Sequence, residues 1–414
     1  MGRVLLVAFL GLVFAGHAIA QEPRIAGLLT AVIEAGSPPR LQAQGCAVFA
    51  EDGRTCARPM REDALVRVAS ISKLVTALGV MRMVETGKLD LDADISGYLG
   101  YPVQHPEFPD RALTLRQLLT HTSALTDGTG YVFGLGTRVE PSFGDAGRFD
   151  PDHAPGAFFR YANYNFVVIG TIMERVSGER FDRLMDRLVL TPLSIEGCFN
   201  WAQCPDGALA KAAVLYRTGP DETQWAPEGP WIAQVDDLKG LRPPCPVYRE
   251  DAAAPCDLTA YKPGENGGLF SPQGGLRISL AGLGRIVAML LSDGQGPAGP
   301  FLMPRSVAQI FAPGWQVPSA GETEKGTMCG YGLSIHLLSG ANKHGCRDDV
   351  FADGKSRAGH IGEAYGLYGG VWIDRAAKRG SIYLVTGTAA DPRSAPGQHS
   401  AFTRIEEWAA AKVR

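Results

Sequence analysis

The pattern of apolar and polar positions divides the chain into helical and strand-like runs separated by long loops. The clearest helix is predicted from Ser70 to Thr86, where an apolar run ends at Gly87, the residue type that most often terminates a helix. A second helix with an apolar stripe is predicted over 165–176. The other predicted helices cover 24–35, 279–292 and 400–412, and the predicted strands lie within 45–69, 330–338 and 366–388.

Two stretches show little periodicity. Residues 128–156 predict an irregular loop near a site. The Pro- and Cys-rich stretch 194–265 is long, and irregular stretches of such length usually have a function or are held by disulfides. Hairpins rather than regular crossovers separate the strands, so we expect an α+β fold, an antiparallel sheet flanked by helices. We expect residues 21–95 and 266–414 to form one discontinuous α/β domain, with a mostly helical domain, 96–265, inserted between them.

The N-terminus predicts export. Arg3, the apolar run Val4–Phe14 and the cleavage site Ala18-Ile19-Ala20 are typical of a signal peptide, which we place at residues 1–20. No cysteine follows that site, so a lipid anchor is not expected after cleavage, and no later stretch predicts a membrane span. We therefore expect a periplasmic or secreted protein.

Composition narrows the function classes. A chain of 414 residues with 45% hydrophobic residues can bury a large core. The formal net charge of −3, without long runs of one sign, argues against a nucleic-acid partner. The sequence does not define an oligomeric state.

The eight cysteines fall in close pairs and, in an oxidising compartment, favour structural disulfides. Eight cysteines allow 105 connectivities, so nearest-neighbour pairing is a hypothesis. No cysteine or histidine spacing typical of a metal site occurs, and we expect neither a metal nor a cofactor. The expected pairs are Cys46 with Cys56, Cys198 with Cys204, Cys245 with Cys256, and Cys329 with Cys346.

Ser70-Ile71-Ser72-Lys73 lies where a strand-like run gives way to a helix-like run. Residues three apart share one helix face, so Ser70 Oγ and Lys73 Nζ can meet. A helix N-terminus disfavours a second cation, and a lysine that loses its proton can accept that of a serine hydroxyl. Ser70 is the candidate nucleophile. The alternative is a helix-capping serine followed by a solvated lysine.

Two further motifs accompany the serine motif: Tyr161-Ala162-Asn163 and, near the C-terminus, His360-Ile361-Gly362. In this order the three motifs resemble those of the serine β-lactamase and penicillin-binding-protein superfamily. The resemblance is best with the class C β-lactamase-like branch, which includes D,D-carboxypeptidases, D-aminopeptidases and family VIII esterases. It covers most of the chain after the signal peptide, including the segment Leu113–Ser123. Lys262-Pro263-Gly264 and Lys378-Arg379-Gly380 also fit the third motif, but the first has a proline unsuited to a sheet ladder and the second is typical of a hairpin turn.

The resemblance implies an acyl-transfer site in a cleft between domains. Lys73 and Tyr161 would share the proton transfers as a coupled pair, and we do not assign the base to either. Asn163 would contact Lys73 and the substrate. The oxyanion hole would be the backbone N–H groups of Ser70 and Glu363, an acidic residue where relatives have a small one.

The same resemblance assigns the third motif a substrate contact. Gly362 suits a close approach of its strand to the substrate. His360 stands where β-lactamases mostly carry lysine, so we expect it to titrate and to attract a substrate carboxylate when charged. His121 is expected to be structural.

The preferred interpretation is therefore an exported serine hydrolase of a small ester, an amide or a peptide with D-amino acids. A β-lactamase is the first alternative. The second is a catalytically inactive binding or scaffold protein of the same fold, against which the complete set of Ser70, Lys73, Tyr161 and Asn163 argues.

Overall fold

The computed structural model describes residues 22–341 and 344–414, so the predicted signal peptide lies outside the described residues. Its centre is a nine-stranded sheet in which every pairing is antiparallel, as the α+β prediction requires. The two chain ends meet in this sheet because β1 pairs with β16 on one side and β2 on the other. In spatial order the strands are β11 (Trp315–Gln316), β12 (Gly330–Tyr331), β13 (His336–Leu338), β14 (Arg357–Ala364), β15 (Leu367–Asp374), β16 (Arg379–Val385), β1 (Gly27–Glu34), β2 (Arg40–Phe49) and β3 (Cys56–Pro59).

The helix predicted over 24–35 is wrong, because this segment forms the strand β1. Its residues are buried almost throughout, since β1 lies inside the sheet and both faces of the sheet are covered. A strand buried on both faces appears in the sequence as a continuous apolar run, which periodicity alone does not distinguish from a buried helix.

Helices cover the two faces of the sheet. Leu29 and Leu384 belong to the large core beneath α1 and α7, whereas Leu28 and Tyr383 belong to a separate core beneath α9. Adjacent residues of one strand therefore enter different cores, as the alternation of side chains along a strand requires. The helices are α1 (Ile71–Glu85), α2 (Ile95–Leu99), α3 (Leu115–Leu119), α4 (Tyr164–Ser177), α5 (Phe181–Met185), α6 (Asp206–Leu209), α7 (Leu280–Leu291), α8 (Pro304–Phe311) and α9 (Arg404–Ala411).

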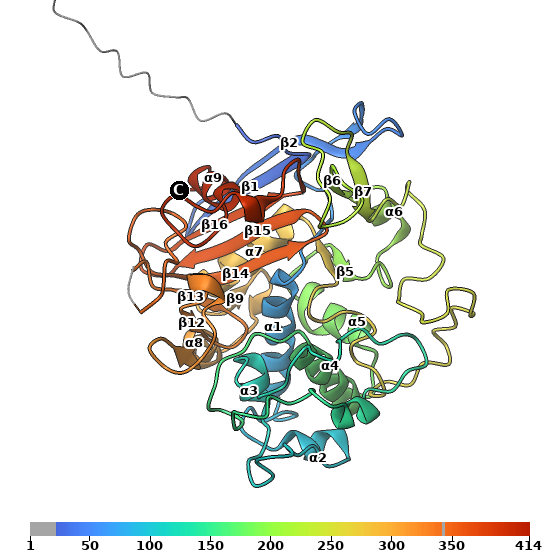
Figure 1. Cartoon of the computed structure of the whole chain (residues 1–414), viewed down its shortest axis with the longest axis vertical. Coiled ribbons are helices and arrows are strands. Elements are labelled where there is room, and N and C mark those ends of the chain that lie inside the picture. Colours follow the sequence, from blue (N-terminus) through green and yellow to red (C-terminus); the bar gives the residue numbers. More distant parts are fainter. Residues whose placement is uncertain (1–21, 342–343) are drawn as a thin grey trace, which may run out of the picture.

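The helix α1 connects the sheet with the helical part of the molecule. It contacts β14 and β15 as well as the π-helical turn η2 (Asp186–Leu190), and twelve of its fifteen residues are buried. Figure 1 shows α2, α3 and α4 gathered at the end of the molecule away from the sheet, with α1 between them. A helix buried on nearly all sides holds its first turn firmly, which matters because the serine motif lies there.

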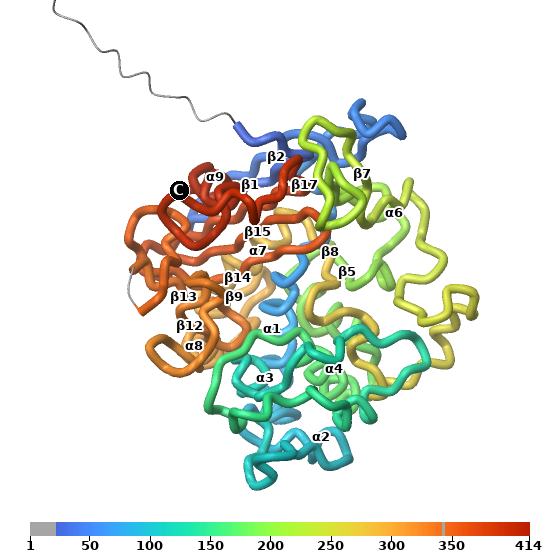
Figure 2. The backbone as a smooth tube through the Cα atoms, in the orientation of Figure 1, coloured from blue at the N-terminus to red at the C-terminus, as the bar shows by residue number. Residues whose placement is uncertain are grey.

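The stretch 194–265 follows a long irregular path along one side of the molecule, drawn in green to yellow in Figure 2. Two of its strands pair with strands of the flanking segments, β5 with β8 and β6 with β17, so the stretch joins the rest of the fold. The division into domains stays a prediction. The strands of the smaller sheets are β4 (Val66–Arg67), β5 (Gly197–Phe199), β6 (Leu215–Arg217), β7 (Ile232–Val235), β8 (Leu276–Ile278), β9 (Gln295–Gly296), β10 (Gly299–Pro300) and β17 (Gly387–Thr388).

Disulfides join the cysteines as nearest neighbours. The structure has the bonds Cys46–Cys56, Cys198–Cys204, Cys245–Cys256 and Cys329–Cys346. Two of the four bonds lie within 194–265, where little regular structure holds the chain. Among the described residues, no group of His, Cys, Asp and Glu side chains is arranged to hold a metal ion, and no helix has both the length and the apolar character to cross a membrane.

Candidate active site

Ser70 lies at a sharp turn between β4 and α1. The preceding residue, Ala69, has a φ of +47°, in the left-handed region that residues with a side chain rarely adopt. The turn is held by backbone bonds, from Val68 to Leu276 on β8 and from Ile71 back to Val68. Ser70 caps α1 without using its hydroxyl to do so, which leaves Oγ available for chemistry.

Lys73 is fully buried one turn into α1, and its ammonium group reaches three oxygen atoms. Nζ lies 2.9 Å from Ser70 Oγ, 2.8 Å from Asn163 Oδ1 and 3.0 Å from the carbonyl of Gln273. Burial lowers the pKa of Lys73 to about 7, an effect that the carboxylate of Asp127 partly opposes. At neutral pH the lysine is therefore present in large part as a free amine within reach of the serine proton.

Asp127 was not among the predicted site residues, although it orients one of them. Its carboxylate accepts hydrogen bonds from the backbone N–H and side-chain Nδ2 of Asn163 and from the backbone N–H of Tyr164, at 2.9 to 3.0 Å. This arrangement turns Asn163 Oδ1 toward Lys73 and caps the start of α4. The only sequence signal is an acidic residue four positions after the Leu113–Ser123 segment, too common a pattern to be recognised.

Tyr161 also contacts Ser70. Its hydroxyl hydrogen-bonds with Ser70, and Lys73 Nζ lies 4.9 Å from the centre of its ring. Burial raises the pKa of Tyr161 well above its usual value, so the phenol keeps its proton. His121 stacks on Tyr161 with ring centroids 4.3 Å apart, and its Nδ1 accepts the backbone N–H of Ala162. His121 therefore has the structural role expected of it.

The role expected of His360, a titrating group that attracts a substrate carboxylate, disagrees with its surroundings. Its side chain has no exposed surface. Nδ1 lies 2.7 Å from the carbonyl of Ile361, to which it donates, so Nε2 accepts from the hydroxyl of Tyr331 at 2.8 Å. Burial, then His336 and Lys73, lower the pKa of His360 well below 6.5. His360 is a neutral imidazole inside the wall, and sequence reasoning missed its partner Tyr331.

Gly362 permits a close approach, but to the protein's own backbone rather than to a substrate. A Cβ atom at this position would lie 2.4 Å from the carbonyl oxygen of Val68. Within the described part of the chain, β13 pairs with β14 only over Arg357–Gly359, so the following residues of β14 face the start of α1. This edge brings the backbone of Glu363 into the wall that also contains Ser70.

The site opens into a cleft with a cavity volume of about 580 Å³. Three large apolar side chains at its mouth are exposed, Val132 by 57%, Tyr248 by 52% and Tyr365 by 38%. The loop predicted near the site, 128–156, contributes Tyr131 and Val132 to the cleft. The stretch 194–265, for which no location was predicted, contributes Asn200, Glu222, Pro246 and Tyr248. The remaining wall includes Arg67, Ser70, Asn163, Gln273, Arg277, Glu363 and Tyr365.

Comparison with protein families matches residues 17–401 to the family described as Beta-lactamase. Among curated proteins, the chain is similar to the esterase EstB of Burkholderia gladioli, at 29% identity over 91% of this chain and 89% of the relative. It is also similar to the D-alanyl-D-alanine-carboxypeptidase/endopeptidase AmpH of Escherichia coli, at 28% identity over 32% of this chain and 36% of the relative.

Among solved structures, the fold is similar to that of EstCE1, a hydrolase with promiscuous acyltransferase activity, with a TM-score of 0.62 and 20% identity over 94% of both chains. It is also similar to the D-amino acid amidase of Ochrobactrum anthropi SV3, with a TM-score of 0.62 and 17% identity over 94% of this chain and 93% of the other. At these identities the likeness concerns the fold.

Proposed function

The chain belongs to the beta-lactamase family and is a serine hydrolase, and from this premise we propose that it is an exported esterase that forms an acyl-enzyme at Ser70. The observation that carries the proposal is the contact of Ser70 Oγ with Lys73 Nζ at 2.9 Å, together with a pKa of Lys73 of about 7. The similarity to an esterase along most of both chains favours esters over other acyl compounds. The apolar cleft mouth suits a substrate with an apolar or aromatic part.

In the proposed acylation step, Ser70 Oγ attacks the ester carbonyl and the free amine of Lys73 takes the hydroxyl proton. Lys73 is the base rather than Tyr161, because burial keeps the phenol protonated. Backbone N–H groups of Ser70 and Glu363 would hold the oxyanion. The hydroxyl of Tyr161 gives its proton to the departing alkoxide and recovers one from Lys73, and water then hydrolyses the ester at Ser70 by the reverse route.

A β-lactamase activity receives less support from the site. The third motif carries a neutral, buried histidine where β-lactamases mostly carry lysine, so this position offers no cation to a β-lactam carboxylate. The cluster of Ser70, Lys73 and Asn163 is complete, which argues against a binding protein without catalytic activity.

The test compares wild type with Ser70→Ala and Ser72→Ala on neutral 4-nitrophenyl esters. Ser72 is a matched control, because its hydroxyl accepts the backbone N–H of Leu276 at 3.1 Å instead of contacting Lys73. We expect Ser70→Ala to lower kcat at least about a thousandfold and Ser72→Ala to retain activity per folded molecule. A fluorophosphonate adduct should map to Ser70. An adduct on Ser72, or a stable penicillin adduct without ester turnover, contradicts the proposal.

Export rests on the predicted signal peptide and on the four disulfides, which form and persist in oxidising compartments. Expression of the full chain in a bacterial host should yield a mature protein that begins at Gln21. A mature protein that retains Met1 and has free thiols would argue against export.

A further inference from the structure

Arg67 is a cation in the cleft that the proposed mechanism does not use. It precedes Ser70 by three residues, on the short strand β4, and its side chain lines the same cavity as Ser70. Nε donates to the carbonyl of Gly274 at 3.1 Å, and the guanidinium lies 4.5 Å from the ring centre of Tyr365. These two contacts fix the plane of the guanidinium.

The terminal nitrogens of Arg67 have no partner of opposite charge. Neither Nη1 nor Nη2 donates a hydrogen bond to any described residue, and no carboxylate of the described chain lies within ion-pair distance. Arg67 also lies directly opposite Arg277 in the pairing of β4 with β8. Like charges in opposite positions of a strand pair repel each other, so this arrangement is unfavourable unless something compensates it.

Arg277 has its own compensation. Its Nε and Nη2 donate to the two oxygens of Asp236 at 3.1 and 2.8 Å, and both side chains are almost completely buried. A third nitrogen, Nη1, donates to Asn200 and to the carbonyl of Gly275. The pair Arg277–Asp236 is therefore neutral and satisfied, and Arg67 remains the uncompensated charge of this wall.

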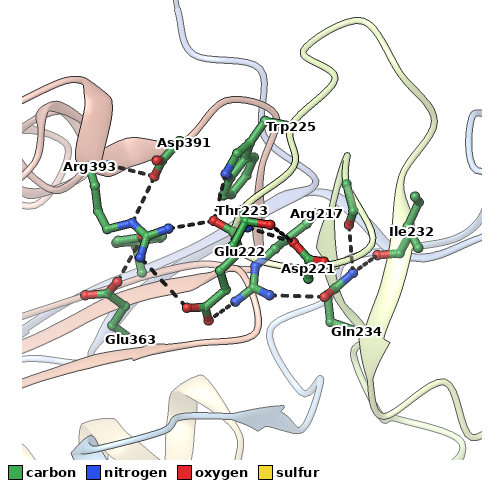
Figure 3. Close-up of polar contacts among 12 residues, drawn as sticks. Arg217, Asp221, Glu222, Thr223, Trp225, Ile232, Gln234, Glu363, Asp391 and Arg393 are labelled. Atoms are coloured by element: carbon green, nitrogen blue, oxygen red, sulfur yellow. Dashed lines mark hydrogen bonds and ion pairs between the residues drawn. The ribbon is translucent and has the colours of Figure 1, made fainter.

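The acidic residues of the cleft are already engaged elsewhere. Figure 3 shows Glu222 between two arginines: it accepts from Arg217 Nη2 at 2.5 Å and lies 3.9 Å from Arg393 Nη1. Glu363 accepts from the hydroxyl of Tyr368 at 3.1 Å, and burial raises its pKa, an effect that this bond, Arg393 and Arg217 partly oppose. The two acidic side chains of the cleft, Glu222 and Glu363, thus have partners within the protein, whereas Arg67 has no acidic partner.

We propose that Arg67 binds a carboxylate of the substrate, so that the preferred esters are half-esters or esters of acids and alcohols that carry a second, anionic group. This inference rests on the proposed esterase function and names its substrate class. A guanidinium matches a carboxylate with two parallel hydrogen bonds, and one held by Gly274 and Tyr365 loses little freedom on binding. Arg67 takes the role that the sequence assigned to His360.

The experiment uses two pairs of esters that differ only in charge. In the first pair, 4-nitrophenol is esterified with adipic acid, whose other end is a free carboxylate or a carboxamide. In the second pair, the hexanoyl ester of 4-hydroxybenzoate is compared with that of 4-hydroxybenzamide. The pairs place the carboxylate on the acyl side and on the leaving-group side. Wild type should prefer the carboxylate in at least one pair.

The variants are Arg67→Met, Arg67→Lys and the matched control Arg285→Met, which removes an exposed arginine on α7 away from the cleft. Arg67→Met should lower kcat/KM for the preferred carboxylate ester by about 10- to 100-fold and for its carboxamide partner by less than about threefold. Arg67→Lys should recover part of the preference, and Arg285→Met should retain it. Arg67→Met should also melt no lower than wild type, because it removes an uncompensated charge.

Binding measured without turnover separates this inference from the proposed function. Calorimetry with the adipate half-ester compares Ser70→Ala with the double variant that also carries Arg67→Met, and the double variant should bind at least about tenfold more weakly. If no ester is hydrolysed but this difference persists, the esterase proposal fails and the carboxylate site stands. The carboxylate site is refuted if wild type hydrolyses the carboxamide and carboxylate esters equally well and Arg67→Met changes neither this ratio nor the affinity for the adipate half-ester. A preference for cationic esters would also refute it.

Discussion

Replacement of Lys73 by methionine tests whether this lysine is neutral in the folded protein. Burial lowers its pKa from 10.5 to about 7. At about 1.4 kcal/mol for each pKa unit, this difference corresponds to at most about 5 kcal/mol of unfavourable free energy for burying the charged form. In the unfolded chain the lysine keeps its proton up to about pH 10.5, whereas in the folded protein it releases the proton near pH 7. The full penalty therefore applies below pH 7, decreases as the pH rises, and disappears above pH 10.5.

Lys73→Met removes this penalty and also removes the hydrogen bonds to Ser70, Asn163 and Gln273. The loss of those bonds shifts stability by a similar amount at every pH, so the slope reports the charge. We expect the stability of the variant relative to wild type to be greatest at pH 6 and to fall by about 1.4 kcal/mol for each pH unit between 7 and 10.

The measurement is urea unfolding from pH 6 to 10 with the disulfides intact, for wild type, Lys73→Met and Lys88→Met. Lys88 is exposed, so its replacement controls for the loss of one charge at the surface. For wild type, kcat/KM on a neutral ester should rise about tenfold per pH unit below pH 7 and level off above it. Parallel stability curves for wild type and Lys73→Met, or a flat kinetic profile between pH 5.5 and 8, would refute the assignment of Lys73 as the neutral base.

Three further predictions concern the surroundings of the site. Asp127→Asn should lower kcat/KM by about 10- to 100-fold, because Asn163 loses the carboxylate that orients it. The acid limb of the kcat/KM pH profile should also move to lower pH, because the carboxylate raises the pKa of Lys73, and an unmoved limb contradicts this role. His360→Lys should lower the melting temperature and the activity together, since it would bury a cation beside Lys73, and a variant as stable as wild type would show that the site has room for a charge. In wild type, the pH profiles of kcat/KM for acidic and neutral esters should run parallel from pH 5.5 to 8, because His360 stays neutral in this range. Gly362→Ala should destabilise the fold by about 1–3 kcal/mol and reduce kcat, as its Cβ meets the carbonyl of Val68, and an unchanged melting temperature in calorimetry would count against that contact.

Much of the site was predictable because its main contact is local. Ser70 and Lys73 lie one helical turn apart, so their spacing alone brings Oγ and Nζ together once the helix forms. The order of the three motifs predicted the family, and the match to residues 17–401 confirms it. The α+β fold with an antiparallel sheet is also confirmed, since hairpin spacing is a local property.

Other features depended on contacts that no local pattern contains. Residues 24–35 form a strand because β2 and β16 pair with both of its edges and helices cover both faces. His360 is neutral because burial, followed by His336 and Lys73, lowers its pKa, although the motif alone suggested a titrating cation.

The sequence by itself determined the serine motif, the fold class and the family, because each is expressed in short local patterns and in their order along the chain. Only the tertiary structure decided which groups are charged. Burial lowers the pKa of Lys73, Asp127 orients Asn163 from 36 residues away, and Arg67 is left without a counter-ion while Arg277 has Asp236. The free energy of a charge depends on its solvation and on every nearby group, whatever their separation in the chain, so it is decided only when the fold is complete.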